Sequence, residues 1–277
     1  MNNQDLKIEL GTVEETLLLP LWARAKDAEK NDPIVNDTYA EGIVARIDYN
    51  FTKFERGQTE SHQLVWAVRA YVFDAAVRKF LEDIDNAVVI NIGAGLDTSF
   101  KRVDDGRVLW ANIDLPDVAA LRQKLIPDSE REITIAKSVF DFTWMEDIAQ
   151  QTKDRSILFM AAGVLCYFES HEVEVLLRKL TDAYPSAHVV FDAMSWLALW
   201  GANRAIMGKS GMDSKARLKW HLKRASRLRK WADTIKIIEE FPIFSRVPIK
   251  HEWSKRLIWD IKMAGRLRLY NLIHIQL

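Results

Sequence analysis

Short apolar runs alternate along this chain with longer stretches in which apolar residues recur every three or four positions. The clearest run, residues 88–92 (VVINI), stops at a Gly-Ala-Gly turn, which is typical of a buried parallel strand. Further strands are predicted at residues 107–113, 133–136, 156–161, 187–191, 234–239 and 270–276.

Helical patterns fill the spaces between the strands. Helices are predicted at residues 12–30, 37–47, 60–82, 115–125, 143–150, 170–183 and 253–263, with another capped by Asp97-Thr98. Pro20 falls inside the first pattern, so that helix is expected to kink or to restart there. Strands and helices in alternation predict an α/β protein with a doubly wound, mostly parallel seven-stranded sheet.

Composition narrows the class of protein. A length of 277 residues with 48% hydrophobic composition is enough to bury one large core. The 39 basic and 39 acidic residues cancel, so no overall field attracts nucleic acid or an anionic membrane. The single cysteine, Cys166, excludes an internal disulfide and a cysteine-type zinc site, and is expected as a small buried hydrophobe. No signal peptide pattern opens the sequence, which predicts a cytoplasmic protein.

The turn after the first strand has the composition of a nucleotide site. Glycines at 93 and 95 would let a ligand lie against the backbone around Ala94. Asp114 ends the second strand about twenty residues later, where a carboxylate can accept hydrogen bonds from both ribose hydroxyls. The alternative is that the glycines merely make a sharp turn.

The turn lacks the third glycine of dinucleotide sites. Leu96, Asp97 and Thr98 follow instead, and no basic residue is placed for a phosphate. A nucleoside without phosphates fits better than NAD, and S-adenosylmethionine is the obvious candidate.

Four separated strings add a family resemblance. In order, they are NIGAGLDTSFKR, NIDLPDVAALRQKLIP, AKSVFDF and LFMAAGVLCYF. They resemble motifs of the leucine carboxyl methyltransferase superfamily, in its bacterial polyketide-type O-methyltransferase branch, and the resemblance runs from about Thr16 to the C-terminus. It implies a class I methyltransferase (Rossmann-like) fold, with S-adenosylmethionine as methyl donor and S-adenosylhomocysteine as product.

This fold predicts one domain over residues 1–277. Its expected parts are an N-terminal helical cover (1–85), a cofactor-binding core (86–194), a helical lid (195–233) and C-terminal strands that complete the sheet (234–277).

The resemblance also changes the interpretation of an arginine. Arg69 lies in the helix before the first strand, and from the residues alone it is interpreted as a solvent-exposed charge on that helix. Related proteins carry an arginine there that pairs with the methionine carboxylate of the cofactor, so Arg69 is predicted to do so; a guanidinium suits a carboxylate because it can bind both oxygens. Arg24 could make a similar contact from the first helix, but its alignment with the family is loose and it is interpreted as a surface charge.

Three further residues are predicted to contact the adenosine part of the cofactor. Leu115 is expected to shelter the ribose or the adenine. Asp141 can accept from the adenine amino group while Phe142 covers the ring. On the residues alone, Asp141 is equally well an N-cap of the next helix; the family pattern favours the adenine role.

Position 162 departs from the family pattern. Relatives usually carry glutamate near the methionine end of the cofactor, whereas this chain has Ala162 in the setting AAG. The change is predicted to weaken cofactor binding or to alter the acceptor, and it leaves a degenerate, non-catalytic cofactor-binding protein as the alternative function.

Residues 194–231 are rich in tryptophan and in basic residues, a combination that can bind nucleic acid. A helical lid with inward-facing aromatics is preferred, because the net charge is zero and no nucleic-acid motif accompanies it.

Methyl transfer to a small-molecule acceptor is the leading functional prediction. Positioning can supply most of the rate of such an in-line displacement, so few catalytic side chains are expected and none is named. The six histidines lack metal-ligand spacing and are expected to be structural, so no metal is predicted. No nucleic-acid or membrane partner is expected, and a nicotinamide oxidoreductase is disfavoured.

Overall fold

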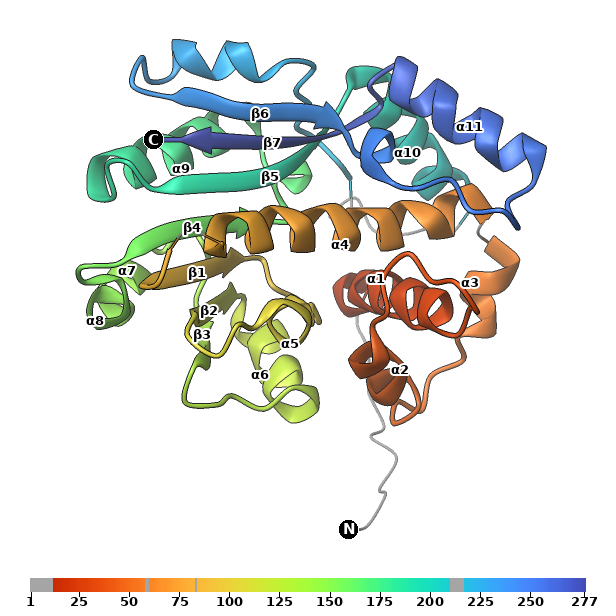
Figure 1. The fold of residues 1–277 in the computed structure, drawn as a ribbon, viewed down its shortest axis with the longest axis horizontal. Coiled ribbons are helices and arrows are strands. Elements are labelled where there is room, and N and C mark those ends of the chain that lie inside the picture. The colour runs from red at the N-terminus through yellow and green to blue at the C-terminus, as the bar shows by residue number, and fades with distance from the viewer. Residues whose placement is uncertain (1–11, 58–59, 83, 210–216) are drawn as a thin grey trace.

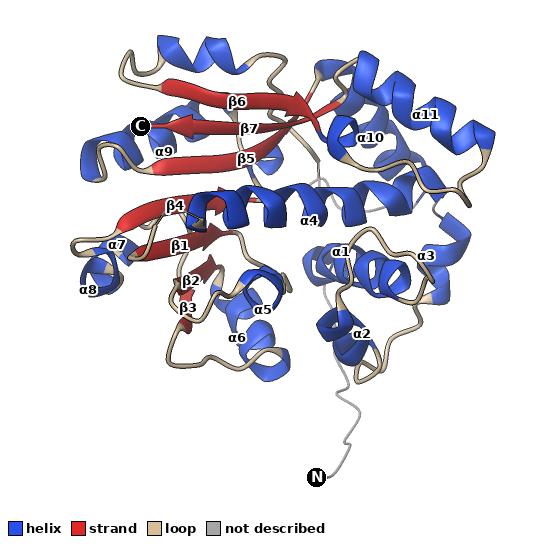
Figure 2. Cartoon of the chain, in the orientation of Figure 1, coloured by secondary structure: helices blue, strands red, loops and turns tan. Residues whose placement is uncertain are grey.

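The computed structural model describes residues 12–57, 60–82, 84–209 and 217–277, and places helices on both faces of a central sheet (Figures 1 and 2). The strands of the described residues are β1 (Ala87–Ile92), β2 (Leu109–Asp114), β3 (Glu132–Ala136), β4 (Ser156–Ala161), β5 (His188–Met194), β6 (Lys236–Pro242) and β7 (Tyr270–Gln276). They form one seven-stranded sheet in the order β3-β2-β1-β4-β5-β7-β6. Only β7 runs antiparallel to its neighbours, β5 and β6.

The order of the strands reverses at the centre of the sheet. β1 pairs in parallel with β2 on one side and with β4 on the other. In open α/β sheets, ligands bind outside the carboxyl ends of the strands at such a switch point. The Gly-Ala-Gly turn after β1 lies there.

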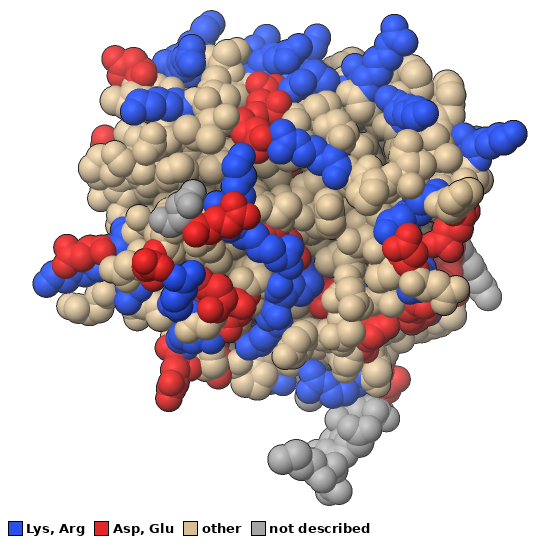
Figure 3. All heavy atoms as spheres, viewed as in Figure 1, with Lys and Arg blue, Asp and Glu red and all other residues tan. Residues whose placement is uncertain are grey.

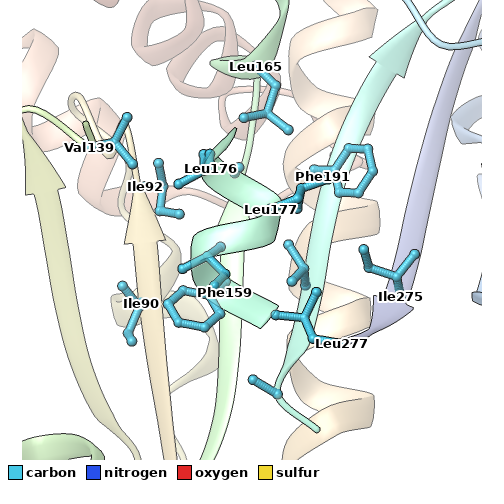
Figure 4. Close-up of a cluster of buried hydrophobic side chains, with 14 of the residues drawn as sticks. Ile90, Ile92, Val139, Phe159, Leu165, Leu176, Leu177, Phe191, Ile275 and Leu277 are labelled. Carbon is cyan, nitrogen blue, oxygen red and sulfur yellow. The ribbon is translucent and has the colours of Figure 1, made fainter. Parts of the chain in front are cut away.

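Both faces of the sheet are buried, and alternate residues of β1 enter different apolar clusters. Val88, Ile90 and Ile92 belong to the cluster beneath α9 (Ser170–Ala183). Figure 4 shows part of this cluster, with Ile90 of β1 and Phe191 of β5 near α9. On the opposite face, the core is covered by α4 (Glu60–Leu81), α5 (Ser99–Val103) and α11 (Lys255–Arg266).

The N-terminal helices form a cover at the carboxyl side of the sheet. They are α1 (Thr12–Ala28), α2 (Thr38–Val44) and α3 (Thr52–Gly57), and they lie on the side to which the arrowhead of β1 points (Figure 1). Leu18 and Leu21 of α1 pack into one cluster with Leu96 of the glycine turn. Apolar contact therefore joins the cover to the candidate site.

A buried charge network also joins the N-terminal cover to the region of the candidate site. The Oδ2 atom of Asp37, the N-cap residue of α2, accepts from Arg24 Nε at 2.8 Å, from an Arg102 nitrogen at 2.7 Å and from Thr98 Oγ1 at 2.6 Å. Arg102 also donates to both carboxylate oxygens of Asp74. Burial by itself raises the pKa of Asp37, but Arg102 and Arg24 outweigh it and the pKa is lowered. Thr98 sits at the N-cap of α5 without the predicted capping bond, because its hydroxyl is committed to Asp37.

The helix predicted at residues 170–183 is found with these ends as α9, the other predicted helices have shifted ends, and α1 continues through Pro20. The helix predicted at 143–150 is two short ones, α7 (Trp144–Asp147) and α8 (Ala149–Thr152). α3 was not predicted. α6 (Pro116–Leu125) follows β2 as expected, with Pro116 in its first turn.

The tryptophan-rich segment is only partly helical. α10 (Trp196–Lys209) follows β5, residues 210–216 with Lys215 lie outside the described residues, and a short 3-10 helix spans Ala225–Lys230. Trp220 is buried, but Trp196 and Trp200 are 60% and 51% exposed, so the prediction that the aromatics face inward is wrong for these two. Both residues lie in the first turns of α10.

Acidic and basic side chains are interspersed on the face drawn in Figure 3, as the balanced composition leads one to expect. Among the described helices, none is both long enough and apolar enough to cross a membrane.

Candidate functional site

The glycine turn after β1 has a backbone that favours glycine. Gly93 and Gly95 have φ angles of 63° and 49°, and a Cβ on Gly93 would lie 2.4 Å from a methyl group of Val164. The amides of Gly93 and Ala94 donate to the Ile113 carbonyl at 2.8 and 3.3 Å. The turn is therefore fixed against the end of β2 and the loop after β4.

Asp114 faces this turn from the end of β2. One carboxylate oxygen accepts the Gly95 N–H at 2.7 Å and the other accepts the Leu115 N–H at 2.8 Å. Burial raises the pKa of Asp114, and these two hydrogen bonds oppose the rise. Each oxygen retains a further lone pair, which is the acceptor chemistry that two ribose hydroxyls require. Leu115 is 49% exposed beside the carboxylate.

Two buried arginines hold the carbonyl groups of the turn. One nitrogen of Arg122 donates to the Gly95 and Asp97 carbonyls at 3.0 and 2.7 Å, and Arg24 donates to the Leu96 carbonyl at 2.9 Å. The interpretation of Arg24 as a surface charge is wrong, since it is 5% exposed. Its partner, Asp37, is the N-cap residue of another helix, α2. The periodicity of the α1 sequence does not reveal such a contact between two elements.

Arg69 lies on α4 with its guanidinium over Trp66, 4.4 Å from the ring centroid. Its side chain is 15% exposed, which contradicts the solvated-charge interpretation. The nearest carboxylate is Asp192 at the end of β5, where an oxygen lies 3.8 Å from an Arg69 nitrogen. The predicted contact of Arg69 with a cofactor carboxylate stays a prediction.

Gly163, the residue after Ala162, lies against the Arg69 guanidinium. Its φ angle is 73°, and a Cβ there would lie 2.1 Å from an Arg69 nitrogen. Its N–H donates to Asp192 at 2.6 Å. Burial raises the pKa of Asp192, while Arg69 opposes the rise. Ala162 is half-buried at the end of β4 and brings no polar group to this place.

Asp141 and Phe142 lie in the turn before α7. Asp141 is exposed, and its Oδ1 atom accepts from the hydroxyl and the N–H of Thr143 at 2.7 and 3.3 Å. These hydrogen bonds hold the pKa of Asp141 below its usual range. The N-cap residue of α7 is Thr143, so Asp141 is not the N-cap itself, and its adenine role stays a prediction. Phe142 is half-buried against the core.

The remaining reactive groups are neutral or distant. Burial raises the pKa of both Cys166 and Tyr167 to about 12. His188 Nδ1 lies 2.7 Å from His274 Nε2 near the amino end of β5, whereas the candidate site lies at the carboxyl ends of the parallel strands. Within the described residues, no three His, Cys, Asp or Glu side chains are grouped so as to hold a metal ion.

The fold is that of a class I methyltransferase. A DUF574 family protein from Streptomyces avermitilis matches with a TM-score of 0.58 at 11% identity, over 96% of this chain and 99% of that one. The plantazolicin methyltransferase BpumL, solved with S-adenosylhomocysteine, matches with a TM-score of 0.50 at 11% identity, over 95% and 98% of the two chains. At these identities the likeness concerns the fold, which is the one predicted.

Sequence comparison defines the family more closely. The model of the leucine carboxyl methyltransferase family matches residues 18–181. The tetracenomycin polyketide synthesis O-methyltransferase TcmP of Streptomyces glaucescens is 34% identical over 188 residues, 68% of either chain. The S-adenosyl-L-methionine-dependent methyltransferase dpfgK of Gibberella zeae is 35% identical over 204 residues, again 68% of either chain. The chain belongs to the leucine carboxyl methyltransferase family, as its motifs predict, and is an S-adenosylmethionine-dependent methyltransferase.

Proposed function

We propose that this enzyme methylates an oxygen atom of a small molecule, either a polyketide-like compound or a carboxylate. Its relative TcmP is named as an O-methyltransferase of polyketide synthesis. The observation that carries the assignment of the site is Asp114, whose carboxylate is fixed beside the glycine turn by the Gly95 and Leu115 amides.

The residues present fit S-adenosylmethionine, which supplies a methyl group activated on a positively charged sulfur. Asp114 has free acceptor capacity for the ribose hydroxyls, and Gly93, Ala94 and Gly95 bring the backbone close. Arg69 can bind the methionine carboxylate, because its guanidinium is held in place by Trp66.

Four further residues complete the proposed pocket. Leu115 covers the ribose or the adenine, Asp141 and Phe142 contact the adenine, and Ala162 leaves space beside the methyl group. These assignments follow the family motifs; the exposure of Leu115 and of Asp141 leaves both able to meet a ligand.

The acceptor side has few groups that can remove a proton. Tyr167 and Cys166 stay protonated near neutral pH, because burial raises the pKa of each to about 12. A carboxylate acceptor is already ionised and needs no general base, whereas a hydroxyl acceptor benefits from one. Positioning of the two reactants then provides most of the rate.

An acceptor screen with S-adenosylmethionine radiolabelled in its methyl group tests this function. Small carboxylic acids and phenols should accept label, and the corresponding methyl esters and ethers should not. Failure of every acceptor, with S-adenosylhomocysteine still bound, would instead support the non-catalytic alternative. The absence of nucleic-acid substrates and a cytoplasmic location stay predictions, tested by including RNA and DNA in the screen and by imaging the tagged protein.

A further inference from the structure

The carboxyl ends of β1, β4 and β5 lie side by side at the candidate site. β4 pairs with β5 as far as Ala161 and Phe191, so Ala162 and Asp192 come next on these adjacent strands. The glycine turn follows β1, which is the other neighbour of β4. Of these three strand ends, only that of β5 carries a carboxylate.

Asp192 and Arg69 lie close together but do not share a hydrogen bond. The 3.8 Å between Asp192 Oδ2 and the nearest Arg69 nitrogen is too long for one, and among the described residues the Arg69 guanidinium donates no other. Asp192 Oδ1 accepts the Gly163 N–H at 2.6 Å, and no other side chain or amide among the described residues is seen to donate to Oδ2.

Burying the Arg69 and Asp192 charges without a hydrogen bond between them costs free energy unless a further group binds to both. The two side chains are only 15% and 14% exposed, and opposite charges removed from water need good hydrogen bonds to offset their lost hydration. Trp66 holds the Arg69 guanidinium, and the Gly163 N–H holds the Asp192 carboxylate. Neither charged group is therefore placed to move toward the other and form the missing hydrogen bond. A ligand with both a negative and a positive group can satisfy both side chains.

We propose that Asp192 accepts a hydrogen bond from the ammonium group at the amino-acid end of S-adenosylmethionine, while Arg69 binds the carboxylate on the same carbon. This inference rests on the proposed placement of the cofactor. The methyl side chain of Ala162 cannot accept a hydrogen bond, so the carboxylate for the ammonium comes from β5 instead of β4. Burial of Asp192 strengthens such a charged hydrogen bond.

The test is Asp192→Asn, which keeps the size of the side chain and an oxygen for the Gly163 N–H but removes the charge. Calorimetry should use four ligands: S-adenosylhomocysteine, its analogue without the amino group, its analogue without the carboxyl group, and 5′-methylthioadenosine, which lacks both. The variant should bind the two ammonium-bearing ligands about tenfold or more weakly and the other two unchanged. Arg69→Met should instead weaken the two ligands that carry the carboxylate.

Asp182→Asn is the matched control, because it removes the same charge from an exposed position on α9. It should leave all four affinities unchanged. Wild-type protein gives a second measurement that needs no variant: it should lose about tenfold or more in affinity when the ligand loses its amino group.

Equal weakening of all four ligands by Asp192→Asn would show that Asp192 only positions Gly163 and Arg69, and would overturn the inference. So would a wild-type protein that binds the ligands with and without the amino group equally well. Wild-type protein that binds none of the four would overturn the proposed cofactor site itself, a result distinct from either.

Discussion

Replacing Asp37 with asparagine tests whether the buried charge network stabilises the cover against the core. Asp37 is fully buried and accepts from Arg24, Arg102, Thr98 and the Ala40 amide. Asparagine keeps one acceptor oxygen but no charge. Arg102 keeps both of its hydrogen bonds to the Asp74 carboxylate, whereas Arg24 loses the one charged partner that it has among the described residues and keeps its bond to the Leu96 carbonyl.

The magnitude follows from this asymmetry. Breaking a buried ion pair by removing one partner costs about 3–5 kcal/mol, and because only one of the two arginines is left without a carboxylate, we expect about 3 kcal/mol. Urea unfolding followed by tryptophan fluorescence measures this loss. Because Arg24 holds the glycine turn, S-adenosylhomocysteine should also bind more weakly to the variant.

Asp32→Asn is the control for this experiment. Asp32 pairs with Lys250 but has a side chain that is 64% exposed, so its loss should cost about 1 kcal/mol or less. If Asp37→Asn destabilises the protein no more than this control does, the network is not a stabilising link and the reasoning fails.

Three further changes probe the site and the pH response. Asp114→Ala should weaken S-adenosylhomocysteine by about 1–3 kcal/mol in calorimetry, because two ribose hydroxyls lose a charged acceptor; unchanged affinity, as expected for the exposed control Asp117→Ala, would remove Asp114 from the site. Ala162→Glu should spare S-adenosylmethionine binding and raise the KM for the acceptor, because it fills space beside the methyl group; tighter cofactor binding with an unchanged KM would show that Ala162 only lacks a contact. Burial lowers the pKa of His274 to about 4 from 6.5, so its contribution to stability is complete above pH 6.5 and is lost as the pH falls toward 4. Between pH 7 and pH 5 the free energy of unfolding should fall by about 2 kcal/mol from this group, and His274→Gln should remove most of that fall in urea titrations; an unchanged pH dependence in the variant would contradict it.

The sheet was predictable because parallel strands buried on both faces read as continuous apolar runs. The run at residues 88–92 and the glycines that follow it located β1 and the switch point directly. Elements with a less regular apolar pattern were predicted less well. α3 was missed, because its six residues are too few to show a helical period.

The site was predictable where a residue ends a strand and less so where a contact crosses between elements. Asp114 was selected because it ends β2, and the structure places its carboxylate on the Gly95 amide, while its contact with the ribose stays a prediction. Arg24 was misjudged because its partners, Asp37 and the Leu96 carbonyl, are 13 and 72 residues away in sequence. Asp192 directly follows the strand predicted at residues 187–191, but its proximity to Arg69 emerges only when α4 is laid against β5.

A crystal structure of the protein with S-adenosylhomocysteine tests the central claim most directly. The account predicts that the ribose hydroxyls bind the Asp114 carboxylate and that the amino-acid end lies between Arg69 and Asp192. A nucleoside bound away from the turn at residues 93–95, with Asp114 making only its present bonds to the Gly95 and Leu115 amides, would contradict it.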